Sequence, residues 1–247
     1  FQAEDGIRDR SVSHGLGDVY KRQMEERGIH ADVAAGLSLG EYCALVAAGV
    51  MTADDAIRTV RERGILMQEA VPAGVGGMSA VLGMTADEIN AVVDEIPNVQ
   101  VANYNCPGQI VISGLKEAVE IAAVKLKEAG ARRVIPLNVS GPFHSYLLEE
   151  AGEKLGKFLE NIPVSEPKIP YVANVTAAYV TKAEDVKPLL TRQVSSSVRW
   201  QQSVETMLAD GVDRFIEIGP GKTLAGFIRK ITVSYTHLRA HETLSDL

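Results

Sequence analysis

A serine set between two glycines is the residue of this chain with the clearest capacity for chemistry. The segment Gly36-Leu37-Ser38-Leu39-Gly40 matches G-x-S-x-G, a pattern in which a sharp turn between a strand and a helix exposes a nucleophilic hydroxyl. Flanking glycines relieve crowding in such a turn, and the helix N-terminus favours an anion beside it. An apolar run precedes the segment and a helical pattern follows it, so we predict Ser38 as a nucleophile; a tight turn with an ordinary serine is the alternative.

His144 is the candidate base for this serine. Among the five histidines it alone lies at a loop–helix junction, directly after the sequence GPF at 141–143. A histidine fixed at such a junction can take and return a proton near neutral pH, although a purely structural role is the alternative. No aspartate is placed obviously to complete a triad, which leaves Asp185 and Glu217 open as third members; a backbone carbonyl on the second ring nitrogen would instead make a dyad.

Arg63 is a charge in an unexpected place. It shares one helical stripe with Ala56, Val60 and Met67, and this apolar stripe is expected to face the core. A buried charge needs a partner. That partner is either an internal acidic group or an anionic ligand, whose carboxylate the guanidinium would hold through two hydrogen bonds.

The elements that must position these side chains fall into two units. Residues 24–75 contain a short strand, the serine turn and two helical patterns, and residues 141–231 return to helices and strands of the same kind. Residues 76–140 follow the order β-α-β-β-α-β instead. We therefore expect an α/β fold, with an α/β-hydrolase-like larger domain over 24–75 and 141–231 and a ferredoxin-like small domain inserted at 76–140.

The two ends of the chain do not fit this pattern. Residues 1–23 follow neither a strand period nor a helix period, and together with residues 232–247 they resemble translated sequencing-adapter sequence. We set both segments aside from the fold, as a foreign leader and a foreign tail.

Composition bounds the class of protein. The 247 residues are 46% hydrophobic and 23% charged, which indicates a folded globular chain, and a net charge of −7 argues against nucleic-acid binding. The longest mostly apolar stretch, residues 33–51, is interrupted by Glu41 and by glycines, so no membrane span is expected. The cysteines Cys43 and Cys106 offer neither a disulfide framework nor metal-ligand spacing, which favours a reducing, cytoplasmic setting without a metal.

Five blocks of sequence resemble the malonyl-CoA:acyl carrier protein transacylase family. They are GLSLGEYCALVAAGV, RERGILMQEAVPAGVGGMSAVLG, NYNCPGQIVISG, VSGPFHS and EIGPGKTLAGF, and they span residues 36–227. The resemblance implies a malonyl transfer from coenzyme A to the phosphopantetheine thiol of acyl carrier protein. In that reaction Ser38 forms the malonyl ester, His144 is general base and acid, and Arg63 holds the malonyl carboxylate. Malonyl-CoA is then the substrate and acyl carrier protein the partner, with no permanently bound cofactor.

The resemblance also implies supporting roles. The amide of Leu39 would stabilise the oxyanion, the backbone carbonyl of Gln193 would orient the histidine, and Asn105 and Gln109 would lie near the cleft between the domains. The acidic carrier protein would need a basic surface, and a cluster near the end of the small domain's second helix could supply it: Lys125, Lys127, Arg132 and Arg133. An ordinary solvated face is the alternative for this cluster.

Two other functions stay open. A serine hydrolase, either a thioesterase or a carboxylesterase, would share the serine and the histidine, but it would favour a carboxylate third member and no buried arginine. A catalytically inactive fragment that binds the carrier protein is the second alternative, because the first strand and the Gly-Gln-Gly motif with which family members begin are not visible before Gly36.

Overall fold

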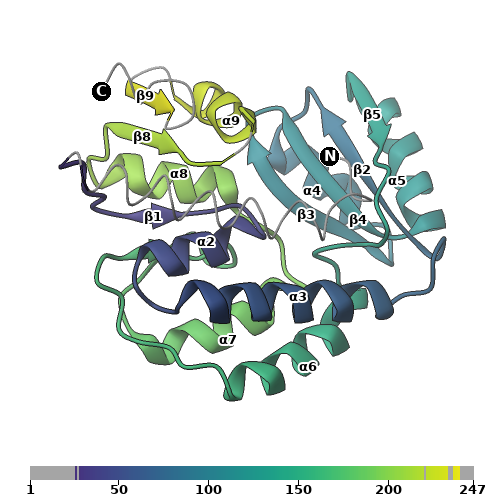
Figure 1. The fold of residues 1–247 in the computed structure, drawn as a ribbon. Coiled ribbons are helices and arrows are strands. Elements are labelled where there is room, and N and C mark those ends of the chain that lie inside the picture. The colour runs from purple at the N-terminus through teal and green to yellow at the C-terminus, as the bar shows by residue number, and fades with distance from the viewer. Residues whose placement is uncertain (1–25, 27, 220, 233–235, 240–247) are drawn as a thin grey trace.

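The fold is α/β, with helices packed around short strands in one part and against a four-stranded sheet in the other (Figure 1). This computed structural model describes residues 26, 28–219, 221–232 and 236–239. The segment 1–23, set aside above as a foreign leader, lies outside the described residues.

The first part surrounds the serine turn. Its elements are β1 (Ala34–Ala35), α2 (Gly40–Ala47), α3 (Ala53–Glu69), the 3-10 turn η1 (Tyr146–Leu148), α6 (Glu149–Glu160), β6 (Tyr171–Val172), β7 (Tyr179–Val180), α7 (Ala183–Gln193), α8 (Trp200–Ala209), β8 (Arg214–Glu217), α9 (Thr223–Ile231) and β9 (Thr236–Arg239). Strand β1 pairs in parallel with β6, and β6 pairs antiparallel with β7. Helices α3, α6 and α7 lie together on one side of β1 (Figure 1).

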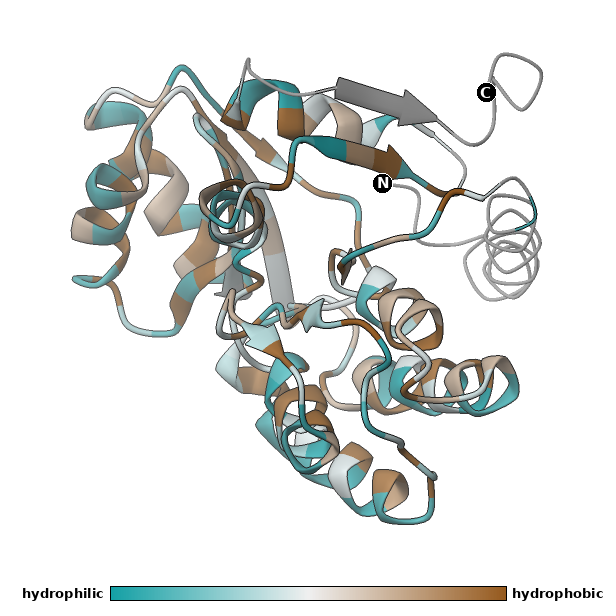
Figure 2. Ribbon diagram, turned by 90° about the vertical axis from the view of Figure 1, so that its left-hand side faces the viewer, coloured by the Kyte–Doolittle hydropathy of each residue, from teal (hydrophilic) through white to brown (hydrophobic). Residues whose placement is uncertain are grey.

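One apolar core holds α2, α3, α6 and α7 together. Its fully buried side chains include Leu45 of α2, Leu155 and Leu159 of α6, and Leu190 of α7. In Figure 2 the helices carry both hydrophobic (brown) and hydrophilic (teal) residues, as amphipathic helices do. The core fixes the position of α3 and, with it, the stripe that carries the arginine.

The second part is a four-stranded antiparallel sheet with two helices. Its elements are β2 (Gly76–Leu82), α4 (Ala86–Val93), β3 (Val99–Cys106), β4 (Gln109–Leu115), α5 (Lys116–Glu128) and β5 (Arg133–Pro136). The strands are ordered β3-β4-β2-β5, and every neighbouring pair is antiparallel. Both helices pack against the sheet through a second apolar core, which includes Ile89, Ile112 and Leu126.

Four residues of the segment 232–247, which is set aside above as a foreign tail, pair with a strand of the fold. Thr236–Arg239 forms β9, which runs parallel to β8 with Arg214 opposite Thr236. An unpaired strand edge offers backbone donors and acceptors to any extended segment that reaches it, whatever that segment's origin.

A cavity of about 810 Å³ lies between β1 and β8. Among the described strands none joins the two, because β1 pairs only with β6 and β8 only with β9. The cavity touches the serine turn at Gly36 and Leu39, but neither Arg63 nor His144 lines it. We therefore place the chemistry elsewhere, beside those two side chains. Within the described ranges, no helix is long and apolar enough to cross a membrane.

Candidate active site

The turn between β1 and α2 presents Ser38. Its backbone has φ = 52°, in the left-handed region that residues with a Cβ adopt at a cost, so the surrounding structure must hold it there. A Cβ at Gly36 would overlap the carbonyl oxygen of Gly40, which explains the first glycine of the pattern. A Cβ at Gly40 would meet no atom within 4 Å, so the second glycine is not required by crowding, contrary to the expectation for both.

His144 meets Ser38 from the loop after the small sheet. Its Nε2 lies 2.7 Å from Ser38 Oγ, and its Nδ1 lies 2.9 Å from the backbone carbonyl oxygen of Gln193. A carbonyl can only accept, so Nδ1 carries the proton and Nε2 accepts the hydrogen bond of the serine hydroxyl. The arrangement is therefore a dyad whose tautomer a backbone carbonyl sets.

Neither of the two carboxylates considered for a triad fills that role. Glu217 accepts hydrogen bonds from the amides of Leu224 and Ala225 at the start of α9, and Asp185 lies in the first turn of α7. The position next to His144 Nδ1 is already taken by the Gln193 carbonyl.

The histidine is buried and strained. Only 3% of its surface is exposed, and its φ of 57° is again left-handed. Gln100 of β3 secures this loop, because its Nε2 donates to the His144 carbonyl (3.2 Å) and its Oε1 accepts from the amide of Tyr146 (3.0 Å). Burial and, second, the nearby Arg63 cation lower the pKa of His144 to about 3, so the ring is neutral and able to accept a proton at neutral pH.

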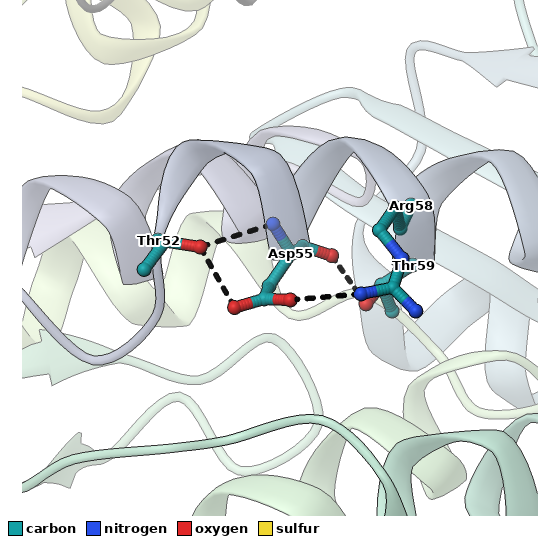
Figure 3. Close-up of polar contacts among 4 residues, drawn as sticks. All are labelled: Thr52, Asp55, Arg58 and Thr59. Atoms are coloured by element: carbon teal, nitrogen blue, oxygen red, sulfur yellow. Dashed lines mark hydrogen bonds and ion pairs between the residues drawn. The ribbon is translucent and has the colours of Figure 1, made fainter.

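Arg63 reaches the same hydroxyl from α3. The residue is buried, its Nη2 donates to Ser38 Oγ over 3.1 Å, and its guanidinium lies 5.8 Å from the centre of the Tyr42 ring. The start of α3 is fixed by Thr52, whose Oγ1 accepts from the Asp55 amide (3.1 Å) and donates to the Asp55 carboxylate (2.7 Å) (Figure 3). The guanidinium of Arg63 and the imidazole of His144 thus both contact Ser38 Oγ.

Three buried polar side chains behind the turn were not predicted from the sequence. Glu41 Oε2 accepts from Gln193 Nε2 (2.7 Å) and from the Asn174 amide (3.2 Å). Asn174 Oδ1 in turn accepts from the Ser38 amide (2.6 Å), and Gln193 Nε2 also donates to the Ser38 carbonyl (3.0 Å). Burial raises the pKa of the Glu41 carboxyl to about 7, against the two hydrogen bonds and the Arg63 charge, which lower it.

A sequence signal exists for only part of this network. Glu41 is a lone charge within an apolar stretch, the same signal that singled out Arg63, and it could have been found in that way. For Gln193 only the carbonyl was expected, on the resemblance. Asn174 carries no local signal, because its contacts depend on the pairing of β1 with β6, which joins residues more than a hundred positions apart.

The remaining predicted residues lie in different places. The Leu39 amide, at the start of α2, donates no hydrogen bond within the described part of the chain, so it can donate to an oxyanion. Asn105 is buried in β3, and Gln109 begins β4, where its Oε1 accepts from Lys230 of α9 (3.4 Å). Neither makes a hydrogen bond with Ser38 or His144, so the structure does not bring them to the dyad.

Among described residues, no three His, Cys, Asp or Glu side chains gather as a metal site.

Comparisons with known proteins agree with this chemistry. The acyl transferase domain family matches residues 21–241. The chain is 49% identical over 213 residues to the malonyl CoA-acyl carrier protein transacylase of Bacillus subtilis (strain 168), covering 85% of this chain and 67% of the relative. It is 42% identical over 225 residues to the enzyme of that name from Staphylococcus aureus (strain MRSA252), covering 90% and 73%.

Solved structures give the same result. An acyl carrier protein S-malonyltransferase from Vibrio cholerae superposes with a TM-score of 0.91 at 41% identity, covering 94% of this chain and 78% of that one. The PlMCAT:AntF complex, a type II PKS acyl-carrier protein with its malonyl-transacylase, gives 0.92 at 40% identity, covering 97% and 79%. On the family match and these identities, the chain belongs to the acyl transferase domain family, among the malonyl-CoA:acyl carrier protein transacylases.

Proposed function

We propose that this chain moves a malonyl group from coenzyme A to the phosphopantetheine thiol of an acyl carrier protein, through a malonyl ester on Ser38. The observation that carries the proposal is the environment of one atom: Ser38 Oγ lies 2.7 Å from the neutral imidazole of His144 and 3.1 Å from the guanidinium of Arg63. A thioester with a free carboxylate needs an attacking oxygen, a proton acceptor and a fixed cation. The names of the relatives above are consistent with that substrate.

The first half-reaction forms the ester. Ser38 Oγ attacks the thioester carbonyl while its proton passes to His144 Nε2, and the Leu39 amide donates to the oxyanion that develops. The carbon–sulfur bond then breaks, and the coenzyme A thiolate leaves with the proton that His144 returns. In the second half-reaction the carrier's pantetheine thiol gives its proton to His144 Nε2 and attacks the ester carbonyl carbon. The bond from that carbon to Ser38 Oγ then breaks, and His144 returns the proton to Ser38 Oγ.

Arg63 has two roles in this proposal. It holds the malonyl carboxylate, for which its position beside the nucleophile is suited, and it lowers the pKa of His144 before substrate binds. A bound carboxylate offsets the guanidinium charge, so the pKa of His144 rises as the malonyl group arrives. The base therefore becomes stronger when the correct substrate is present.

The geometry favours transfer over hydrolysis. A carbonyl, not a carboxylate, holds the second nitrogen of His144, and a cation lies beside the nucleophile, where a simple esterase has no need of one. The proposed reaction uses no metal and no resident cofactor, because its proton transfers and its charge stabilisation are supplied by side chains and a backbone amide.

We also propose the finer architecture and setting. Residues 24–75 and 141–231 form an α/β-hydrolase-like domain, and residues 76–140 form a ferredoxin-like insertion, which the sheet order β3-β4-β2-β5 supports. Asn105 and Gln109 would contact the longer substrate groups at the cleft. The basic cluster Lys125, Lys127, Arg132 and Arg133 is exposed and would receive the acidic carrier. The two free cysteines support a cytoplasmic setting.

Intact-protein mass spectrometry after brief mixing with malonyl-CoA tests the proposal. The chain should gain a malonyl-sized adduct that is absent in Ser38→Ala, and adding a carrier protein with its phosphopantetheine arm should remove the adduct by transfer. Loss of the adduct to water at the same rate, with or without the carrier, would identify a hydrolase. No adduct on the unaltered chain would contradict the acyltransferase and favour a binding fragment.

A further inference from the structure

The backbone of Ser38 is held at two points by the network behind the turn. Its amide donates to Asn174 Oδ1 over 2.6 Å, and its carbonyl accepts from Gln193 Nε2 over 3.0 Å. Asn174 Nδ2 also donates to the Gly36 carbonyl over 2.7 Å, so the turn is held before and at the serine. A left-handed φ of 52° persists only where such contacts over-determine it.

Both of these contacts depend on a single oxygen atom. Glu41 Oε2 accepts from Gln193 Nε2 and from the backbone amide of Asn174, and Glu41 is 1% exposed, so water does not compete for that oxygen. Gln193 also supplies the carbonyl that holds His144 Nδ1. Glu41 therefore connects, through one residue on each side, the backbone of the nucleophile with the residue that orients the base.

We propose that Glu41 is a positioning residue of this active site, which acts through Gln193 and Asn174 to hold the Ser38 backbone and the neighbouring Leu39 amide in the attacking geometry. The inference rests on the proposed function. It assigns Glu41 no contact with substrate, and it differs from a purely structural role because its loss should slow the chemical step in a protein that is still folded.

The test substitutions are chosen because one oxygen atom, Glu41 Oε2, accepts both hydrogen bonds. Glu41→Gln keeps an acceptor oxygen where Oε2 lies, removes the charge and replaces Oε1 by an amide NH2 group. Glu41→Leu has a similar volume and removes both hydrogen bonds. If Glu41→Leu does not fold, Glu41→Asp replaces it, because the shorter side chain withdraws the oxygen from both donors. Thr59→Val is the matched control, since it deletes the hydrogen bond that the buried Thr59 side chain donates through Oγ1 to the Asp55 carbonyl on α3, a bond that does not reach the dyad (Figure 3).

Two measurements are made on each protein: the rate at which a fluorophosphonate probe labels Ser38, and the malonyl-CoA dependence of Ser38 acylation. Misplacement of reacting groups by about 1 Å costs about 100-fold in rate, so we expect labelling of Glu41→Leu to fall by about that factor. Its maximal acylation rate should fall equally, while half-saturation by malonyl-CoA stays the same. Glu41→Gln and Thr59→Val should remain close to the unaltered chain.

Each of the other possible outcomes contradicts the positioning role of Glu41, the proposed function, or both. Any of four results overturns the positioning role. Ser38 of Glu41→Leu is labelled at the normal rate, Glu41→Gln or Thr59→Val slows labelling as much as Glu41→Leu does, or the only change in Glu41→Leu is in half-saturation by malonyl-CoA. A wild-type chain that takes the fluorophosphonate but not malonyl-CoA overturns the proposed function alone, and the labelling rates of the variants then still decide this inference. A wild-type chain inert to both reagents overturns both proposals.

Discussion

Removing the charge of Arg63 should make the nucleophile sensitive to acid. Burial and this guanidinium together hold the pKa of His144 at about 3, so a protonated imidazole, which cannot accept the serine proton, forms only in strong acid. Arg63→Gln keeps a polar group near the hydroxyl and removes the cation. The pKa of His144 should then rise, and the reactivity of Ser38 should fall on acidification at a higher pH than in the unaltered chain.

The size of the shift follows from two distances. The hydrogen bonds from Arg63 Nη2 to Ser38 Oγ and from there to His144 Nε2 measure 3.1 and 2.7 Å, so the two cations would be separated by no more than those bonds combined. At about 6 Å and an effective dielectric constant of about 20, two unit charges interact by about 3 kcal/mol, or about 2 pKa units. The midpoint should therefore move from near pH 3 to about pH 5.

Labelling of Ser38 by phenylmethylsulfonyl fluoride measures this shift, because that reagent is neutral and does not need the arginine for binding. Rates are compared between pH 4 and 6, where the Glu41 carboxyl, whose pKa is about 7, is mostly protonated in both proteins. Circular dichroism at each pH confirms that the proteins are folded. Arg61→Gln makes the same charge change at an exposed position of α3 and is the control.

The expected result is a rate that stays level from pH 6 to 5 in the unaltered chain and in Arg61→Gln, and that falls to about half by pH 5 in Arg63→Gln. A level profile down to pH 4 in Arg63→Gln would refute the electrostatic reasoning. A fall of the same size in Arg61→Gln would also refute it, because the effect would then reflect net charge and not the site.

Three further results are expected. Gly36→Ala should lower the free energy of unfolding in urea by about 2 kcal/mol or more, because the added Cβ overlaps the Gly40 carbonyl. Gly40→Ala should be neutral or slightly stabilising, because its Cβ meets open space. Equal effects of the two substitutions would contradict the account of the turn. Arg63→Ala should lose the preference for malonyl over acetyl thioester more than reactivity itself, as competition between the two donors will show, and an unchanged preference would remove its assigned role. Reversing the charges of Arg132 and Arg133 together should weaken transfer to the carrier protein without changing Ser38 acylation by malonyl-CoA, and unaffected transfer would exclude this docking surface.

Local patterns were sufficient to find the three side chains that meet at the serine hydroxyl. The glycine pattern placed Ser38 on a turn before a helix, and a charge on an apolar stripe singled out Arg63. His144 followed from its position after a loop. What no local pattern contains is that these three segments meet, and the resemblance supplied that step.

The supporting network was missed for a physical reason. Asn174 and Gln193 reach the turn through pairing of two-residue strands and through the end of a helix, and such contacts depend on the tertiary fold and not on nearby residues. Strand β9 was missed because its segment was set aside, although a free edge of β8 can pair with it. The role of Gly40 was overstated because the pattern does not show which glycine is crowded.

Two of the four described non-glycine residues with a left-handed φ, Ser38 and His144, have a consequence for protein engineering. Ser38 and His144 both have a φ that glycine would adopt without cost, so each retains strain that a glycine would relieve. Selection for thermostability alone would therefore tend to favour replacement at the two positions to which we assign the nucleophile and the base. A stabilised variant of this chain should be sought with both positions held fixed, because here stability and activity make opposite demands on the same residues.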